Sequence, residues 1–186
     1  WDDIAKSHGA DIFCSLSAAA IKMLTQDILE DMLRVESIKK IILGVGNDNC
    51  WTIDKFRELN AGILNGLSQA DWKIIAASID GARAVLALDK EKIKDLSADA
   101  LRNMLCASKS IAKVIFNVGG NGCWTDEQFS AALKTFSKFG GYLFDIFGGN
   151  KWNEIAKALG ADIFSSLSVA AIKMLSRDIF EEDRKS

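Results

Sequence analysis

Apolar side chains recur along the chain at the three- and four-residue spacing of an amphipathic helix. The clearest stripes consist of Ile28, Leu29, Met32 and Leu33 and, further along, of Leu101, Met104 and Leu105. Residues at these spacings lie on one face of an α-helix, so each stripe predicts a helix with one buried side. The pattern as a whole predicts an all-α fold.

Hydroxyl residues stand directly before several of these apolar runs. A Ser or Thr side chain at such a place can accept a hydrogen bond from a first-turn amide, which favours the start of a helix. The predicted N-caps are Ser17, Thr25, Ser97, Thr125, Ser168 and Ser176. Thr125 with Gln128 matches a capping box. A repeated step Leu-Ser/Thr-x-Asp also places a carboxylate in the positive first turn of three helices, at Asp27, Asp99 and Asp178.

The helical pattern occurs about two and a half times. Residues 1–24 return as residues 152–175 with the same tryptophan, glycine and Ser-Leu-Ser landmarks, and a more divergent copy begins at Trp72. Residues 37–56, with their Cys-Trp-Thr sequence, return as residues 110–129. We therefore interpret residues 1–186 as a single helical repeat domain, with units at about 1–71, 72–151 and 152–186, the last of them partial.

Each unit of roughly 72 residues contains two related halves of about 36 residues, each expected to form a helix-turn-helix. Periods of this size with helical patterning are typical of α-solenoids, whose units bury their faces against neighbouring units. The predicted fold is an all-α, α-solenoid-like superhelical array of short helix-turn-helix repeats. Residue 1 falls inside a repeat and residue 186 about halfway through one, which predicts a longer array or end-to-end assembly.

Composition narrows the functional classes. The chain is 49% apolar, with a mean hydropathy of +0.09, which is ample for a folded core. Its 23 basic and 25 acidic residues leave a net charge of -2, so no general field attracts nucleic acid or anionic lipid. No apolar run approaches the roughly 18 residues of a membrane span. The sequence has no proline, so its 14 glycines must provide the breaks between helices.

Catalytic chemistry is not indicated. His8 is the only histidine and its counterpart in the last copy is Leu159, so no histidine-dependent base or multi-histidine metal site can be assembled. Residues 44–52 and 119–125 contain glycines before a helix, as phosphate loops do, but lack the remaining motif residues and are expected to be turns. We predict no enzyme activity, no catalytic residue, no metal site and no cofactor.

Tryptophans mark two positions of the repeat. Trp1, Trp72 and Trp152 share one position, and Trp51 and Trp124 share the other. Recurrence at a fixed repeat position favours a packing role. Tryptophan is also common in protein interfaces, so Trp1, Trp51 and Trp124 are candidates for an interaction surface.

The four cysteines are widely spaced and none forms a Cys-x-x-Cys pair, which argues against a structural zinc site. In an oxidising compartment, the preferred pairing among the three possible ones joins Cys14 to Cys50 and Cys106 to Cys123. Buried free thiols are the alternative.

Two stretches resemble known repeats. Residues 12–17, Ile-Phe-Cys-Ser-Leu-Ser, followed by Ile21, Leu24 and the Leu-Ser/Thr-x-Asp step, resemble the repeats of the mesothelin, stereocilin and otoancorin family. This resemblance covers mainly the first half of each unit and implies an extracellular, superhelical and adhesive protein. Residues 68–84 look like the helix, glycine loop and helix of TAL-effector-like DNA-binding repeats.

These observations lead to one preferred function and two alternatives. The preferred hypothesis is a non-enzymatic protein-interaction, adhesion or structural-assembly module that binds another protein or copies of itself. The alternatives are a nucleic-acid-binding helical repeat protein, which the balanced charge disfavours, and an extracellular lipid or hydrophobic-ligand binder. The sequence does not fix the compartment, although an extracellular location is preferred to a cytoplasmic one.

Overall fold

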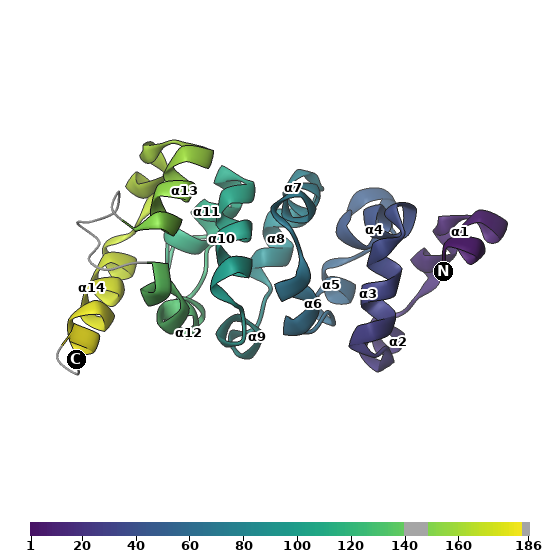
Figure 1. Cartoon of the computed structure of the whole chain (residues 1–186), viewed down its shortest axis with the longest axis horizontal. Coiled ribbons are helices and arrows are strands. Elements are labelled where there is room, and N and C mark those ends of the chain that lie inside the picture. The colour runs from purple at the N-terminus through teal and green to yellow at the C-terminus, as the bar shows by residue number, and fades with distance from the viewer. Residues whose placement is uncertain (140–148, 184–186) are drawn as a thin grey trace.

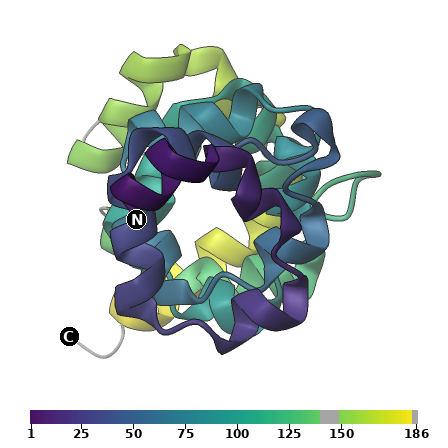
Figure 2. The same cartoon turned by 90° about the vertical axis from the view of Figure 1, so that its right-hand side faces the viewer.

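A computed structural model describes residues 1–139 and 149–183 of the chain. These residues form short helices and no strand, apart from one isolated β-bridge between Val45 and Trp51. The predicted all-α class is therefore confirmed for the described part of the chain. The molecule is elongated, with its first and last helices at opposite ends (Figure 1), and the helices lie around its long axis (Figure 2).

The helices follow one another with short connections, and η denotes a 3₁₀-helix. In chain order they are α1 (Asp2–His8), η1 (Ala10–Ser15), α2 (Ala18–Met23), α3 (Gln26–Arg34), α4 (Glu36–Leu43), η2 (Asn47–Asn49), α5 (Ile53–Arg57), α6 (Ala61–Gly66), α7 (Gln69–Ala77), α8 (Gly81–Leu86), α9 (Lys90–Lys94), α10 (Ala98–Ala107), α11 (Lys109–Phe116), α12 (Asp126–Phe136), η3 (Ser137–Phe139), α13 (Asn150–Leu159), η5 (Ala161–Ser166) and α14 (Val169–Asp183).

Helices pack mainly on the third major helix before or after them. Helix α7 contacts α4 and α10, and α10 also contacts α13. In the same way α8 contacts α5 and α11, and α12 contacts α9, whereas its other contact, with α14, is to the second α-helix after it. Packing partners therefore lie three α-helices apart in most of the chain, where the predicted helix-turn-helix units would place them two apart. The additional elements are helices such as α6 and α9, with six and five residues, which are too short to show a periodic apolar stripe.

Five of the six predicted N-caps are confirmed. Ser17, Thr25, Ser97, Thr125 and Ser168 each accept a hydrogen bond from the amide three residues later. The capping box of Thr125 and Gln128 is also present. The prediction for Ser176 is wrong, because α14 continues through this residue where the first copy breaks between α2 and α3. Amides inside a continuing helix bond to the preceding turn and require no cap.

The predicted apolar stripes face one continuous core. Leu29, Met32, Leu101, Met104 and Leu105 are buried, and Ile28 and Leu33 are half-buried against them. Buried apolar side chains form a single cluster that extends from Phe13 in η1 to Leu175 in α14. The helices of the described residues thus share one continuous core.

Candidate interaction surface

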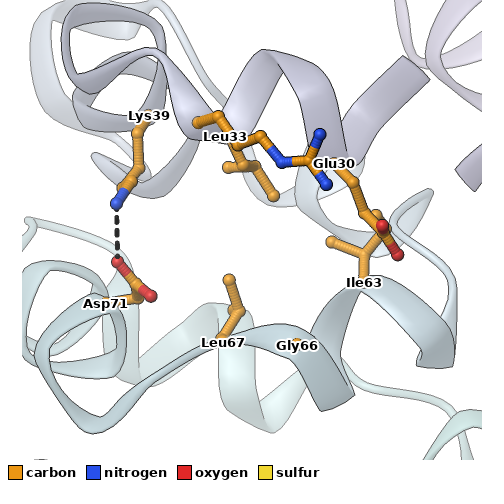
Figure 3. A pocket seen from close by; sticks show the side chains of 8 residues that line it. Glu30, Leu33, Lys39, Ile63, Gly66, Leu67 and Asp71 are labelled. Carbon is orange, nitrogen blue, oxygen red and sulfur yellow. Dashed lines mark ion pairs between the residues drawn. The ribbon is translucent and has the colours of Figure 1, made fainter. Parts of the chain in front are cut away.

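A groove lies between the pair α3 and α4 and the following pair α6 and α7 (Figure 3), with a volume of about 370 Å³. Leu33 points into it from one side and Leu67 from the other, with Ile63 further along (Figure 3). The remaining lining residues are Glu30, Arg34, Lys39, Gly66 and Asp71. An apolar floor with charged groups around it can accept an apolar side chain and orient its polar neighbours.

An ion pair closes one end of the groove. The Lys39 ammonium on α4 lies 3.4 Å from the Asp71 carboxylate on α7 (Figure 3). Burial alone would raise the pKa of Asp71, but hydrogen bonds from the Ser68 hydroxyl and amide, together with the Lys39 charge, lower the pKa below its ordinary value. The carboxylate is therefore ionised at neutral pH, and the pair joins the two walls of the groove.

The three tryptophans expected at an interaction surface have different environments. Trp51 and Trp124 are fully buried, so the prediction that they belong to such a surface is wrong. Both indoles fill the core beneath a loop, and Trp124 Nε1 donates a hydrogen bond of 3.1 Å to the Val85 carbonyl oxygen. Trp1 is exposed and packs edge-on against Phe13, with 5.9 Å between the ring centroids. Only Trp1 of the three can contact a partner without unfolding.

One of the two predicted disulfides is present. Cys14 and Cys50 are bonded, which joins η1 to the loop before α5. The predicted pair of Cys106 and Cys123 is wrong, because both are free. Cys106 is buried on α10, and this burial raises the pKa of its thiol to about 11, so the thiol stays protonated and unreactive at neutral pH.

The repeat explains why Cys123 has no disulfide partner. Cys123 occupies the repeat position of Cys50, and Leu86 occupies that of Cys14. The position that would complete a second disulfide is thus occupied by a leucine, which has no thiol. Cys106 belongs to a different position of the repeat.

The two Cys-Trp-Thr loops, residues 44–52 and 117–125, have matching backbone hydrogen bonds. The Gly46 amide donates to the Trp51 carbonyl at 2.7 Å, and the Gly119 amide donates to the Trp124 carbonyl at 2.9 Å. Both glycines have positive φ, 82° and 78°, which glycine adopts without a steric penalty. The loops are turns between helices, as the sequence predicted.

A polar side chain beside each loop joins it to the preceding turn. Lys55 Nζ donates to the carbonyl oxygens of Cys14 and Cys50, both at 2.7 Å. At the same repeat position, Gln128 Nε2 donates to the carbonyl oxygens of Leu86 and Leu88 at 2.9 and 2.7 Å. The sequence pattern predicted Gln128 only as a capping residue and indicated no role for Lys55. Their common position, three residues after a Cys-Trp-Thr threonine, was the available signal.

Other chemistry is not assembled in the described residues. Within residues 1–139 and 149–183, no three His, Cys, Asp or Glu side chains are grouped as metal ligands. His8 lies in the last turn of α1, exposed to solvent. Of the helices that the structure describes, none has both the length and the apolar composition needed to cross a membrane.

Comparisons with known proteins give no relative. No known protein family, no curated protein and no solved structure matches this chain.

Proposed function

We propose that the chain is a non-enzymatic protein-interaction module, built as an α-solenoid-like superhelical array, with a role in adhesion or structural assembly. The observation that carries this proposal is the packing of most α-helices between α2 and α13 on the third α-helix along the chain. Such stacking spreads the surface along an extended array instead of enclosing one site, and extended surfaces of this kind suit binding to proteins.

Polar contacts between successive turns support a rigid array. Lys39 pairs with Asp71 between α4 and α7, and Arg102 pairs with Glu154 between α10 and α13. The Thr135 hydroxyl of α12 donates to the Leu96 carbonyl oxygen at 3.3 Å. Each contact fixes one turn on its neighbour, which lowers the entropy lost when a partner binds across several turns.

The compartment and the adhesive role are part of the proposal. Structural disulfides persist in oxidising compartments, so the bond between Cys14 and Cys50 supports an extracellular location. Adhesion is what the resemblance of residues 12–17 to mesothelin-type repeats implies.

The experiment is affinity capture with a matched pair of groove variants. A Cβ atom added at Gly66 meets no atom within 4 Å, so this residue can be enlarged without a backbone clash. Gly66→Phe is expected to fill the groove, whereas Gly66→Ala leaves it open. The immobilised wild-type chain and both variants are exposed to an extract of the source tissue or cells, and retained proteins are identified by mass spectrometry.

Three results are distinguishable. A protein retained by the wild type and Gly66→Ala, but not by Gly66→Phe, supports an interaction through the groove. Retention by all three chains supports the interaction function and places the contact elsewhere. If no protein is retained above a blank support, and the chain instead binds DNA in a salt-sensitive manner, the nucleic-acid alternative replaces this proposal.

A small apolar ligand is the second candidate, and the apolar floor of the groove favours it. The volume of about 370 Å³ falls in the range of small-molecule pockets. An anilinonaphthalene dye should then bind the wild type and Gly66→Ala with a rise in fluorescence that Gly66→Phe abolishes. Equal fluorescence from all three chains would exclude this candidate.

A further inference from the structure

The dipeptide Asn-Gly occurs twice in the chain, at Asn65–Gly66 and at Asn121–Gly122. In this dipeptide the glycine amide nitrogen can attack the side-chain carbonyl carbon of the asparagine, because glycine has no side chain that hinders the approach. The reaction requires an asparagine side chain that is free to turn toward its own backbone and a glycine amide that is not hydrogen-bonded. The two dipeptides differ in both respects.

At the first dipeptide both reacting groups are held. Asn65 Nδ2 donates a hydrogen bond of 3.0 Å to the Asp95 carbonyl oxygen, and Asn65 Oδ1 accepts one of 2.7 Å from the Ser97 amide. Gly66 is the last residue of α6, where the geometry of the helix directs its amide to the carbonyl four residues earlier. The side chain of Asn65 is thus part of the packing between α6 and residues 95–97, and we expect it to be unreactive in the folded chain.

The second dipeptide lies in the loop of residues 117–125, where Asn121 and Gly122 are both exposed to solvent. Among the described residues, no hydrogen bond involves the Asn121 side chain or the Gly122 amide. Gly122 has φ 70°, and a Cβ atom added to it would meet no other atom within 4 Å. The two groups that must react are therefore accessible to each other and to water.

The first Cys-Trp-Thr loop, residues 44–52, has no asparagine that precedes a glycine. Asp48 occupies the repeat position of Asn121, and Asn49 occupies that of Gly122. The first loop therefore already carries an aspartate where the second carries an asparagine. Hydrolysis of the Asn121 amide would give the second loop the same residue type at this position.

We propose that Asn121 is a site of spontaneous deamidation in the folded protein. The Gly122 nitrogen loses its proton to hydroxide and bonds to Cγ of Asn121. The bond from Cγ to Nδ2 then breaks, and ammonia leaves after taking a proton from water. Water opens the resulting succinimide ring at one of its two carbonyl carbons: opening at Cγ gives aspartate, and opening at the main-chain carbonyl gives isoaspartate. The sum of these steps is hydrolysis of an amide by water, without oxidation or reduction.

Both products change the loop. Each adds one carboxylate to an exposed position of a chain whose net charge is -2. Isoaspartate also routes the backbone through Cβ and Cγ, which lengthens it by one atom between Gly119 and Trp124. The Gly119 amide and the Trp124 carbonyl oxygen are joined by the hydrogen bond of 2.9 Å that closes this loop. The inference goes beyond the proposed interaction function and does not depend on it.

The first test compares the two dipeptides within the full chain. The purified protein is incubated at mildly alkaline pH, once folded and once in urea, and is then digested with trypsin. Peptide 58–73 contains Asn65, and peptide 114–134 contains Asn121. Deamidation raises the mass of a peptide by the difference between water and ammonia, and fragment ions identify the residue. A sample without incubation corrects for deamidation during digestion.

In the folded chain, the mass change should occur at Asn121 and not at Asn65. In urea both residues should react, at similar rates, because the hydrogen bonds that hold Asn65 are lost. The rate at Asn121 should rise in proportion to the hydroxide concentration, since the attack requires a deprotonated amide. Equal rates at the two residues in the folded chain, or no reaction at Asn121, would overturn the proposal.

Two variants test the role of the dipeptide itself. Asn121→Gln keeps a side-chain amide but would have to form a larger ring, so the mass change at this residue should disappear. Gly122→Asn introduces the residue of the first loop, and asparagine tolerates positive φ better than most residues. Its side chain hinders the attack, so deamidation at Asn121 should become much slower. Circular dichroism checks that both chains are folded, and an unchanged rate in folded Gly122→Asn would contradict the proposal.

The products test the ring intermediate. The Asn121→Asp chain supplies a reference peptide for the aspartate product. Incubated wild type should give this peptide and a second one of equal mass but different chromatographic retention, which is the isoaspartate form. Formation of the aspartate peptide alone would indicate direct hydrolysis of the side chain and would overturn the proposed attack by Gly122.

Discussion

The two Cys-Trp-Thr loops have matching backbone hydrogen bonds and the same repeat position, but different bonds hold them to the preceding helices. The first loop is held by the disulfide of Cys50 with Cys14 and by the ammonium of Lys55. The second loop has a free cysteine and is held by the amide of Gln128 and the indole N–H of Trp124.

Three features are common to both loops. In both loops a glycine amide donates a hydrogen bond to the tryptophan carbonyl, the indole is buried, and the residue three after the threonine donates to a carbonyl of a preceding helical segment. The bonds to the preceding helices differ in type. The first loop has a disulfide and a hydrogen bond from a lysine ammonium, whereas the second has neutral hydrogen bonds from an amide and an indole N–H. The two loops therefore have these contacts at the same positions, although the types of bond differ.

The largest effect is expected from removing either buried indole. Trp51→Ala and Trp124→Ala should each lower the free energy of unfolding by about 3–5 kcal/mol, because each leaves a cavity in the core. Trp124→Ala should cost about 1 kcal/mol more, since it also leaves the Val85 carbonyl without its donor, whereas Trp51 Nε1 has no hydrogen-bond partner within the described chain.

Urea unfolding followed by circular dichroism measures both free energies. Phe substitutions at the same positions serve as controls, because they keep most of the ring and remove the N–H. Trp124→Phe should then be the more harmful of the two. Equal losses of unfolding free energy for Trp51→Phe and Trp124→Phe would show that the hydrogen bond to Val85 does not contribute to stability.

The next largest effect concerns the disulfide. Cys14 and Cys50 are 36 residues apart, and a loop of this length predicts that Cys14→Ser with Cys50→Ser loses about 3–4 kcal/mol, by the chain-entropy argument. Because α1 buries no residue, its amides should exchange with solvent faster once the bond is broken.

Cys123→Ser is the matched control and should leave the free energy of unfolding within about 0.5 kcal/mol of the wild type. Alkylation of the native, unreduced chain should modify Cys123 and spare buried Cys106. Reduction should then expose two further thiols to the reagent. Alkylation of Cys14 or Cys50 in the native, unreduced chain would contradict the disulfide between these two residues.

A smaller effect is expected at the two donor residues. Gln128→Ala removes two hydrogen bonds to the preceding turn and one from the capping box, which should cost about 1–2 kcal/mol. Lys55→Ala should cost less in the wild type, because the disulfide still holds the loop. In the Cys14→Ser, Cys50→Ser background, Lys55→Ala should approach the cost of Gln128→Ala, and a double-mutant cycle measures this coupling. A coupling energy of zero would mean that the disulfide and the hydrogen bonds of Lys55 stabilise the loop independently.

The comparison also shows which features can be predicted from a sequence. Local signals predicted most helix starts, since a cap such as Ser97 depends on a few neighbouring residues. The sequence predicted the bond between Cys14 and Cys50 correctly and the bond between Cys106 and Cys123 wrongly, because the spacing of two cysteines along the chain does not give the distance between them in space. Residues of identical repeat position also differ in exposure, as Trp1 and Trp152 do, since exposure depends on whether another turn lies above.

Two further sequence predictions were wrong or incomplete, for different physical reasons. Thr25 breaks the first copy into α2 and α3, while Ser176 at the equivalent position lies inside α14. Serine and threonine are both tolerated in a helix or at its cap, so the surrounding packing decides between the two outcomes. The short helices α6 and α9 were missed because fewer than two helical turns give no periodic signal. The groove next to α6 was therefore beyond prediction as well.

The smallest net effect is expected from installing the missing disulfide. If the two loops are equivalent, Leu86→Cys should bond to Cys123 on oxidation, because Gln128 reaches the Leu86 carbonyl as Lys55 reaches that of Cys14. The cross-link should add about 2–4 kcal/mol and the loss of the half-buried leucine should remove a comparable amount, so oxidised Leu86→Cys should unfold near the wild type. Reduced Leu86→Cys should have a lower free energy of unfolding by that amount.

Intact mass and thiol titration detect the bond, and Leu86→Ser provides the control without a thiol. Two free thiols at 86 and 123 after oxidation of the folded chain would show that the loops share hydrogen bonds but not the side-chain geometry that a disulfide needs.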